Sequence, residues 1–149
     1  MGQKVYPTGF RLGITEEWRS RWYADKDYAA KLQNDLELRK YLTKRLRRAA
    51  VSRVEIERAG DKVKVIIYTA RPGIVIGKKG SEIDQIRGEL EKVAGVSKGQ
   101  LSVDVIEIKR PELDAVLVAQ SIAEQLEGRV AFRRAMRKAV QSARKAGAK

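Results

Sequence analysis

A turn of two glycines and two lysines is the part of this sequence best suited to bind an anion. It consists of Gly77, Lys78, Lys79 and Gly80. Glycines let a phosphate approach the backbone, the amides that open a following helix favour negative charge, and lysines add mobile cations. A nucleoside triphosphate loop is excluded, because it needs four residues between its glycines and then Lys-Ser or Lys-Thr. Two glycines at this spacing are common by chance, so the value of the motif depends on the elements around it.

A second cationic feature lies at the C-terminal end. From Gly128 onward the chain has eight basic residues and no acidic one. At 100° per residue, seven of them fall within roughly half of a helical circumference: Arg129, Arg133, Arg134, Arg137, Lys138, Arg144 and Lys145. A solvated polar face is the ordinary interpretation of such a pattern. Because no acid interrupts this set, we predict a phosphate-binding helix over about 129–146.

The composition agrees with a polyanionic partner. The 149 residues include 32 Lys and Arg against 19 Asp and Glu, which gives a formal charge of +13. A protein this basic gains binding free energy by releasing the counterions condensed on nucleic acid phosphates. Hydrophobic residues make up 43% of the chain, enough to build one compact core and to exclude a wholly disordered basic tail.

The chain contains neither Cys nor His. This excludes disulfides, thiolate nucleophiles, imidazole metal sites and histidine-based catalytic triads. We expect no cofactor, no metal and no catalytic residue, although an enzyme that uses carboxylates such as Asp104 and Glu107 is a weak alternative without an acidic cluster to support it. No apolar run approaches the roughly 20 residues of a membrane span, so we expect a soluble, cytoplasmic protein without a membrane partner.

Hydrophobic periodicity predicts the elements that position these motifs. An amphipathic helix is expected over 28–49 and a β-hairpin around Gly60. Ser81 and Asp84 resemble a capping box at the start of the helix after the glycine turn, and the last strand should bulge or twist near Val105. Pro111 is expected at a helix start. The predicted ranges are a helix at 28–49, strands at 51–58, 62–69 and 100–107, and helices opening at 81, 111 and 129.

The first 25 residues differ from the rest. Aromatic and basic residues are mixed there, and Pro7 with three glycines interrupts any helical or strand period. We therefore predict that these residues form an N-terminal arm. Two interpretations stay open: its aromatic side chains pack back onto the core, or they stack on RNA bases while its cations bind phosphates.

The order of these elements resembles the type II K homology (KH) domain, in which a Gly-x-x-Gly loop grips the backbone of about four nucleotides. Longer blocks resemble the bacterial family of small-ribosomal-subunit protein three. The collinear blocks are Met1–Val5 with Pro7, Gly9 and Arg11–Ile14, then Thr69–Gly80, Lys109–Ala115 and Phe132–Met136.

The resemblance implies an α+β fold with the order α-β-β-α-α-β. It implies an N-terminal arm (1–25), a type II KH domain (26–110) and two C-terminal helices (111–149) from an incomplete second α/β domain. It also implies a structural protein of the small-subunit head that binds rRNA, lies beside the channel through which mRNA enters, and assists passive unwinding of mRNA. A free RNA chaperone of the KH type, acting off the ribosome, is the alternative.

The resemblance also assigns residues and partners. Expected RNA contacts are Gly77, Lys78, Lys79, Gly80, Lys4, Arg11 and Arg71, and the residues expected to face incoming mRNA are Arg133, Arg134, Arg137 and Lys138. Expected partners are head rRNA, mRNA and the small-subunit proteins two, ten and fourteen.

Overall fold

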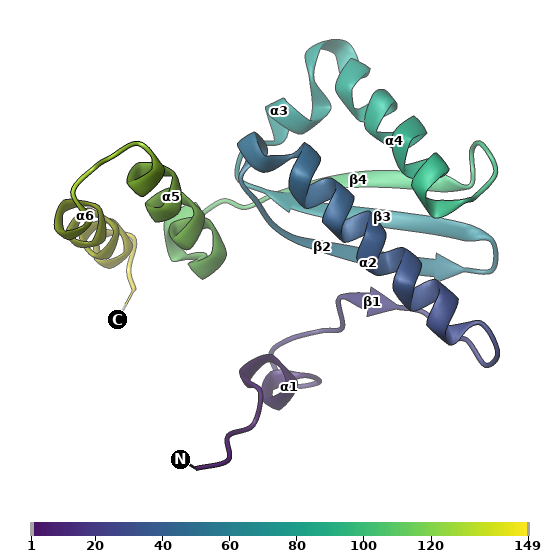
Figure 1. Cartoon of the computed structure of the whole chain (residues 1–149), viewed down its shortest axis with the longest axis horizontal. Coiled ribbons are helices and arrows are strands. Elements are labelled where there is room, and N and C mark those ends of the chain that lie inside the picture. Colours follow the sequence, from purple (N-terminus) through teal and green to yellow (C-terminus); the bar gives the residue numbers. More distant parts are fainter. Residues whose placement is uncertain (1, 149) are drawn as a thin grey trace.

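A computed structural model describes residues 2–148, so both ends of the chain, Met1 in the predicted arm and Lys149 in the predicted C-terminal region, lie outside the described residues. The structure has a four-stranded sheet. Figure 1 shows the helices that pack on this sheet and the C-terminal helices α5 and α6 beside it. The elements are α1 (Pro7–Arg11), β1 (Ser20–Arg21), α2 (Tyr28–Arg45), η1 (Arg47–Ala49), β2 (Val51–Ala59), β3 (Lys62–Thr69), α3 (Pro72–Ile76), η2 (Lys78–Gly80), α4 (Ser81–Ala94), β4 (Leu101–Glu107), η3 (Pro111–Leu113), α5 (Ala115–Glu127) and α6 (Phe132–Lys145).

The sheet has the order β1-β2-β3-β4. The strands β2 and β3 form the predicted antiparallel hairpin, while β1 with β2 and β3 with β4 pair in parallel. From α2 to β4 the elements follow the predicted order α-β-β-α-α-β. The predicted α+β fold is therefore confirmed.

The core lies between one face of this sheet and the helices α2 and α4 (Figure 1). Alternate residues of a strand point to the same face, so the apolar residues of β2, β3 and β4 meet the leucines of α2. Completely buried members of this core are Leu38, Leu42, Ile56, Val65, Ile67, Val75, Ile86 and Leu90. Burying a side chain of this size contributes roughly 1.5–3 kcal/mol to stability.

The predicted irregularity near Val105 is wrong. The strand β4 pairs with β3 without interruption from Val63↔Leu101 to Thr69↔Glu107. The register shift occurs instead in β2, between Val51 and Arg53. The pattern was misleading because Ile106 lies on the opposite face of a regular strand, where it is 42% exposed.

The helix predicted to open at 81 does begin at Ser81, but its predicted cap and the starts predicted at 111 and 129 differ from the structure. Ser81 already has helical dihedral angles, and Gly80 is the N-cap of α4 without a side-chain hydrogen bond, so no capping box forms. The last helix begins at Phe132, because Arg129 adopts the left-handed φ of +61° and lies outside it. Pro111 begins the short 3-10 turn η3, and α5 starts only after Asp114.

The helices α5 and α6 pack on each other beside the KH-like domain (Figure 1). Among the described residues of the pair, Leu117 and Ala135 are buried. Polar contacts join α5 to the start of β2: the Gln120 side chain donates a 3.1 Å hydrogen bond to the Val51 carbonyl, and the Ser52 hydroxyl donates a 2.6 Å bond to Asp114. These contacts fix the position of α5.

Candidate nucleic-acid interface

The predicted glycine turn connects α3 to α4 and contains three left-handed residues. Gly77 has φ +71°, Lys79 has φ +54° and Gly80 has φ +82°. At Gly77 an added Cβ would lie 2.6 Å from Cγ of Glu82, so the turn cannot accept a side chain there without moving α4. Left-handed backbone costs roughly 1–2 kcal/mol for an ordinary L-residue. The glycines therefore permit both the sharp turn and the close approach of its backbone to α4.

The turn borders a shallow hollow of about 490 Å³ lined by Gly73, Ile74, Gly77, Lys78, Ser81 and Glu82. Lys78 and Lys79 are both exposed, and neither has a carboxylate within ion-pair distance among residues 2–148. Glu82 is the acidic group of this hollow, and Arg45 lies 3.2 Å from its carboxylate. The hollow therefore combines exposed cations, open backbone and the first turn of α4, which suits a phosphate.

Arg71 is the N-cap of the five-residue helix α3, at the opposite end of that helix from the turn. Its side chain is exposed, and its backbone N–H donates a 3.0 Å hydrogen bond to the Thr69 hydroxyl. The apolar residues of α3 divide between two roles: Val75 is buried in the core, whereas Ile74 is 46% exposed beside the turn. The structure thus places Ile74 with Gly77 and Lys78 in the lining of the hollow, whereas Arg71 is not part of that lining.

The four predicted mRNA-facing residues form a second cationic surface, on α6. Arg133, Arg134, Arg137 and Lys138 are all exposed. At 100° per residue, Arg133 and Arg137 lie opposite the buried Ala135, whereas Arg134 and Lys138 lie on the flank of the helix nearer to it. The part of the chain that the structure describes offers them no carboxylate within 4.0 Å. This surface is separate from the glycine turn, because α6 lies beyond α5 (Figure 1). The helix thus presents a row of uncompensated cations.

Side-chain contacts with α2 hold the second half of the arm in place. The buried carboxylate of Asp35 accepts hydrogen bonds from the Ser20 hydroxyl (2.7 Å) and the Trp22 indole (2.8 Å), and it forms a 2.6 Å ion pair with Arg58. The Trp22 ring also lies 5.3 Å from the Tyr28 ring. These contacts hold β1 against the edge of β2.

The first half of the arm is more open. Lys4 is exposed, while Arg11 donates a 3.0 Å hydrogen bond to the Pro7 carbonyl. The other aromatic side chains of the arm are largely exposed: Tyr6, Phe10, Trp18 and Tyr23. The two interpretations of the arm therefore apply to different residues, because Trp22 packs onto the domain and the exposed rings remain available for a partner. The helix α1, which ends at Arg11, lies apart from both α6 and the α3–α4 connection (Figure 1).

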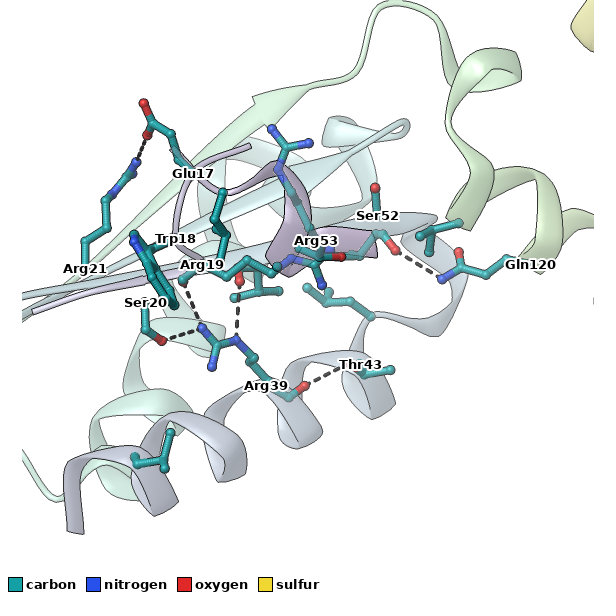
Figure 2. Close-up of a pocket in the computed structure, with 18 of the residues that line it drawn as sticks. Glu17, Trp18, Arg19, Ser20, Arg21, Arg39, Thr43, Ser52, Arg53 and Gln120 are labelled. Carbon is teal, nitrogen blue, oxygen red and sulfur yellow. Dashed lines mark hydrogen bonds and ion pairs between the residues drawn. The ribbon is translucent and has the colours of Figure 1, made fainter. Parts of the chain in front are cut away.

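Arg39 contacts the arm, although it is not among the residues predicted for the site. Figure 2 shows its guanidinium pointing from α2 into a groove of about 1390 Å³ between the arm, α2, β2 and α5. The guanidinium donates to the carbonyls of Arg19 (2.8 Å) and Val54 (3.4 Å) and to the Ser20 hydroxyl (2.6 Å). Burial lowers the pKa of Arg39. The residue positions the arm, and no sequence signal marks an arginine whose partners are backbone carbonyls.

Within residues 2–148, no group of three or more Asp and Glu side chains is placed to hold a metal ion. None of the helices in that range is long and apolar enough to cross a membrane.

Comparison with known proteins shows the family to which the chain belongs. A KH domain model matches residues 37–113. The chain is 57% identical over 148 residues to small ribosomal subunit protein uS3 of Rhodospirillum centenum, and the match covers 99% of this chain and 64% of that protein. It is 56% identical over all 149 residues to the uS3 proteins of Lactiplantibacillus plantarum and Syntrophus aciditrophicus, of which it covers 67% and 68%. The chain thus spans about two thirds of the length of these curated relatives, which are named as ribosomal proteins and not as enzymes. It contains a KH domain and belongs to the uS3 family of small ribosomal subunit proteins.

Proposed function

We propose that this protein is a structural, RNA-binding component of the small ribosomal subunit and acts in the ribosome in the cytoplasm. The observation that supports this most strongly is the turn at residues 77–80, where left-handed glycines leave the backbone open and two exposed lysines have no acidic partner among residues 2–148. A KH loop of this kind holds the nucleic acid backbone rather than the bases.

The finer part of the proposal concerns the head of the subunit. The arm (1–25) contacts head rRNA through Lys4 and Arg11 and touches neighbouring proteins, which the family resemblance names as small-subunit proteins two, ten and fourteen. The KH domain occupies 26–110, and residues 111–149 begin a second α/β domain. The exposed apolar side chains of Leu126 and Met136 support that last assignment, because such faces normally pack against another element.

The helix α6 lines the path of incoming mRNA in this proposal. Arg133, Arg134, Arg137 and Lys138 bind the phosphates of strands that open transiently, and the translating ribosome supplies the energy. The unwinding is passive in this scheme: exposed cations stabilise the open strand without a chemical step.

The loop assignment is tested by a charge reversal, Lys78→Asp with Lys79→Asp. We expect weaker binding to a transcript of the small-subunit head rRNA and an unchanged thermal midpoint, because both side chains are exposed. The matched control reverses Lys92 and Lys98, which are exposed at the other end of α4. Equal losses in both variants, or a large fall in the thermal midpoint of the loop variant, would contradict a specific loop site.

The role of α6 is tested separately by replacing Arg133, Arg134 and Arg137 with Ala. We expect ribosomes that carry this variant to translate mRNA with a stable hairpin more slowly, while subunit assembly changes less. An equal loss of assembly and hairpin unwinding would contradict the division between α6 and the rest of the chain.

A further inference from the structure

The end of α2 and the short turn η1 contain six basic residues. Three of them make hydrogen bonds or ion pairs with other residues of the chain. Arg39 binds backbone carbonyls, Arg45 lies 3.2 Å from Glu82 and 3.5 Å from Glu89, and Arg47 lies 2.6 Å from Glu127. The other three are Lys40, Lys44 and Arg48, which are exposed and have no carboxylate within 4.0 Å among residues 2–148.

These three residues form one row, which we call the α2 row. Lys40 and Lys44 are four positions apart in α2, so they lie about one helical turn apart on the same face. Arg48 follows in the 3-10 turn η1, after α2 has ended. Leu38 and Leu42, two positions before the lysines, are completely buried against the sheet. Two positions correspond to about 200° around a helix, so Lys40 and Lys44 face away from the core. Arg48 lies just beyond α2, and its side chain is also exposed.

Stabilisation of the helix end does not account for the α2 row. Cations interact favourably with the macrodipole only within the last turn, and that turn contains Lys44 and Arg45. Lys40 precedes it, and Arg48 lies beyond α2 in η1. Like charges one turn apart repel each other. A polyanion bound along these residues would relieve that repulsion.

The position of the row indicates what that partner is. The ion pair between Arg45 and Glu82 joins the end of α2 to the first turn of α4, directly after the glycine turn. The ion pair between Arg47 and Glu127 joins the residues after α2 to the last turn of α5, just before α6. The α2 row thus lies between the two cationic surfaces described above, and α3 and α5 flank the end of α2 in Figure 1.

We propose that Lys40, Lys44 and Arg48 bind the phosphate backbone of RNA and extend the KH loop site along α2. This inference rests on the proposed RNA-binding function. Three side chains of one sign without an apolar residue between them suit phosphates, whereas a protein partner would also require an apolar contact at the centre of the surface. The row contributes affinity without base specificity.

The test is a triple substitution, Lys40→Gln, Lys44→Gln and Arg48→Gln, in the full chain. The control removes three exposed lysines far from the row: Lys62→Gln, Lys92→Gln and Lys98→Gln. Binding to the head rRNA transcript is measured across a range of salt concentrations. Each lost phosphate contact lowers the slope of log K against log salt by roughly 0.7–0.9, so we expect a decrease of about two in the row variant and less than one in the control. If the triple variant folds poorly, the three single variants are measured instead. Each should lower the slope by less than the triple variant is expected to.

The outcomes separate this inference from the proposed function. If the slope of log K against log salt changes equally in the row variant and the control, only the total charge matters. That result would contradict RNA binding by the α2 row. An unchanged slope in the row variant also overturns it, while a weakened Lys78→Asp and Lys79→Asp variant would keep the proposed function intact. Normal RNA binding combined with failure to enter subunits would assign the row to a protein partner instead. If the unaltered chain binds no RNA, the proposed function and the α2 row both fail.

Discussion

The KH domain and the C-terminal helix pair are stabilised in different ways. Between α2, α4 and the sheet, the large apolar side chains are closed off from solvent, and Leu38, Leu42, Ile56 and Ile86 are completely buried. In the helix pair, large apolar side chains such as Leu126, Phe132 and Val140 are 44–63% exposed. Burial gives the KH domain its stability, whereas polar contacts from α5 to β2 and η1 fix the helix pair in place. A cationic surface on the first region is therefore held more rigidly than one on the second.

The largest expected effect is in the closed region, at Asp35. Asp35→Ala leaves the guanidinium of Arg58 without its buried partner and removes the acceptor for Ser20 and Trp22. Breaking a buried pair in this way costs about 3–5 kcal/mol. Urea unfolding should show this loss, and proteolysis should cut the arm sooner. A loss below about 1 kcal/mol would show that the Asp35 cluster does not anchor the arm.

A matched pair of leucine substitutions compares the two regions directly. Leu42→Ala creates a cavity in the closed core and should cost about 2–5 kcal/mol. Leu126→Ala removes a side chain that is 44% exposed, and the free energy of unfolding should fall by about 1 kcal/mol or less. Equal losses in the two variants would contradict the difference in burial.

A smaller effect is expected at the start of α5. Asp114 accepts hydrogen bonds from the backbone N–H groups of Val116 (3.0 Å) and Leu117 (3.1 Å), as well as from the Ser52 hydroxyl. Asp114→Ala removes this N-cap, which costs about 0.5–2 kcal/mol. Hydrogen exchange should accelerate in α5 and stay unchanged in α2. Faster exchange in α2 as well would mean that the two regions unfold together.

The smallest effect is expected at the exposed ion pair between Arg47 and Glu127. Exposed pairs of this kind contribute about 1 kcal/mol or less. Arg47→Ala should therefore change stability little, and a double-mutant cycle with Glu127→Ala should give a coupling energy that falls as salt is added. A coupling that persists at high salt would make this contact a larger part of the α5 attachment than burial suggests.

The sequence predicted those features that depend on local patterns. Alternating residues such as Val63, Val65 and Ile67 identified the hairpin, and the absence of acids after Gly128 identified the charged face of α6. The family resemblance identified the KH loop between α3 and α4. In each case the signal lies within one element or one continuous motif.

The remaining features depend on partners far apart in the chain. Asp35 sits within a helix where a carboxylate normally faces solvent, and its burial depends on Arg58 and on the arm. Arg39 reaches backbone carbonyls, which every residue possesses. The error at Ser81 has a local cause: a serine followed by an acid also fits the first turn of a helix whose cap is a left-handed glycine. Periodicity does not encode these arrangements.

The most direct test of the proposed function is the specificity of RNA binding by the purified chain. Affinity is measured for a transcript of the small-subunit head rRNA and for an unrelated structured RNA of equal length, at low and near-physiological salt. The account predicts a preference for the head transcript that survives the higher salt, because the cationic surfaces are held in a fixed arrangement. Equal binding to both RNAs that fades with salt would contradict it and would favour a free RNA chaperone that uses charge alone.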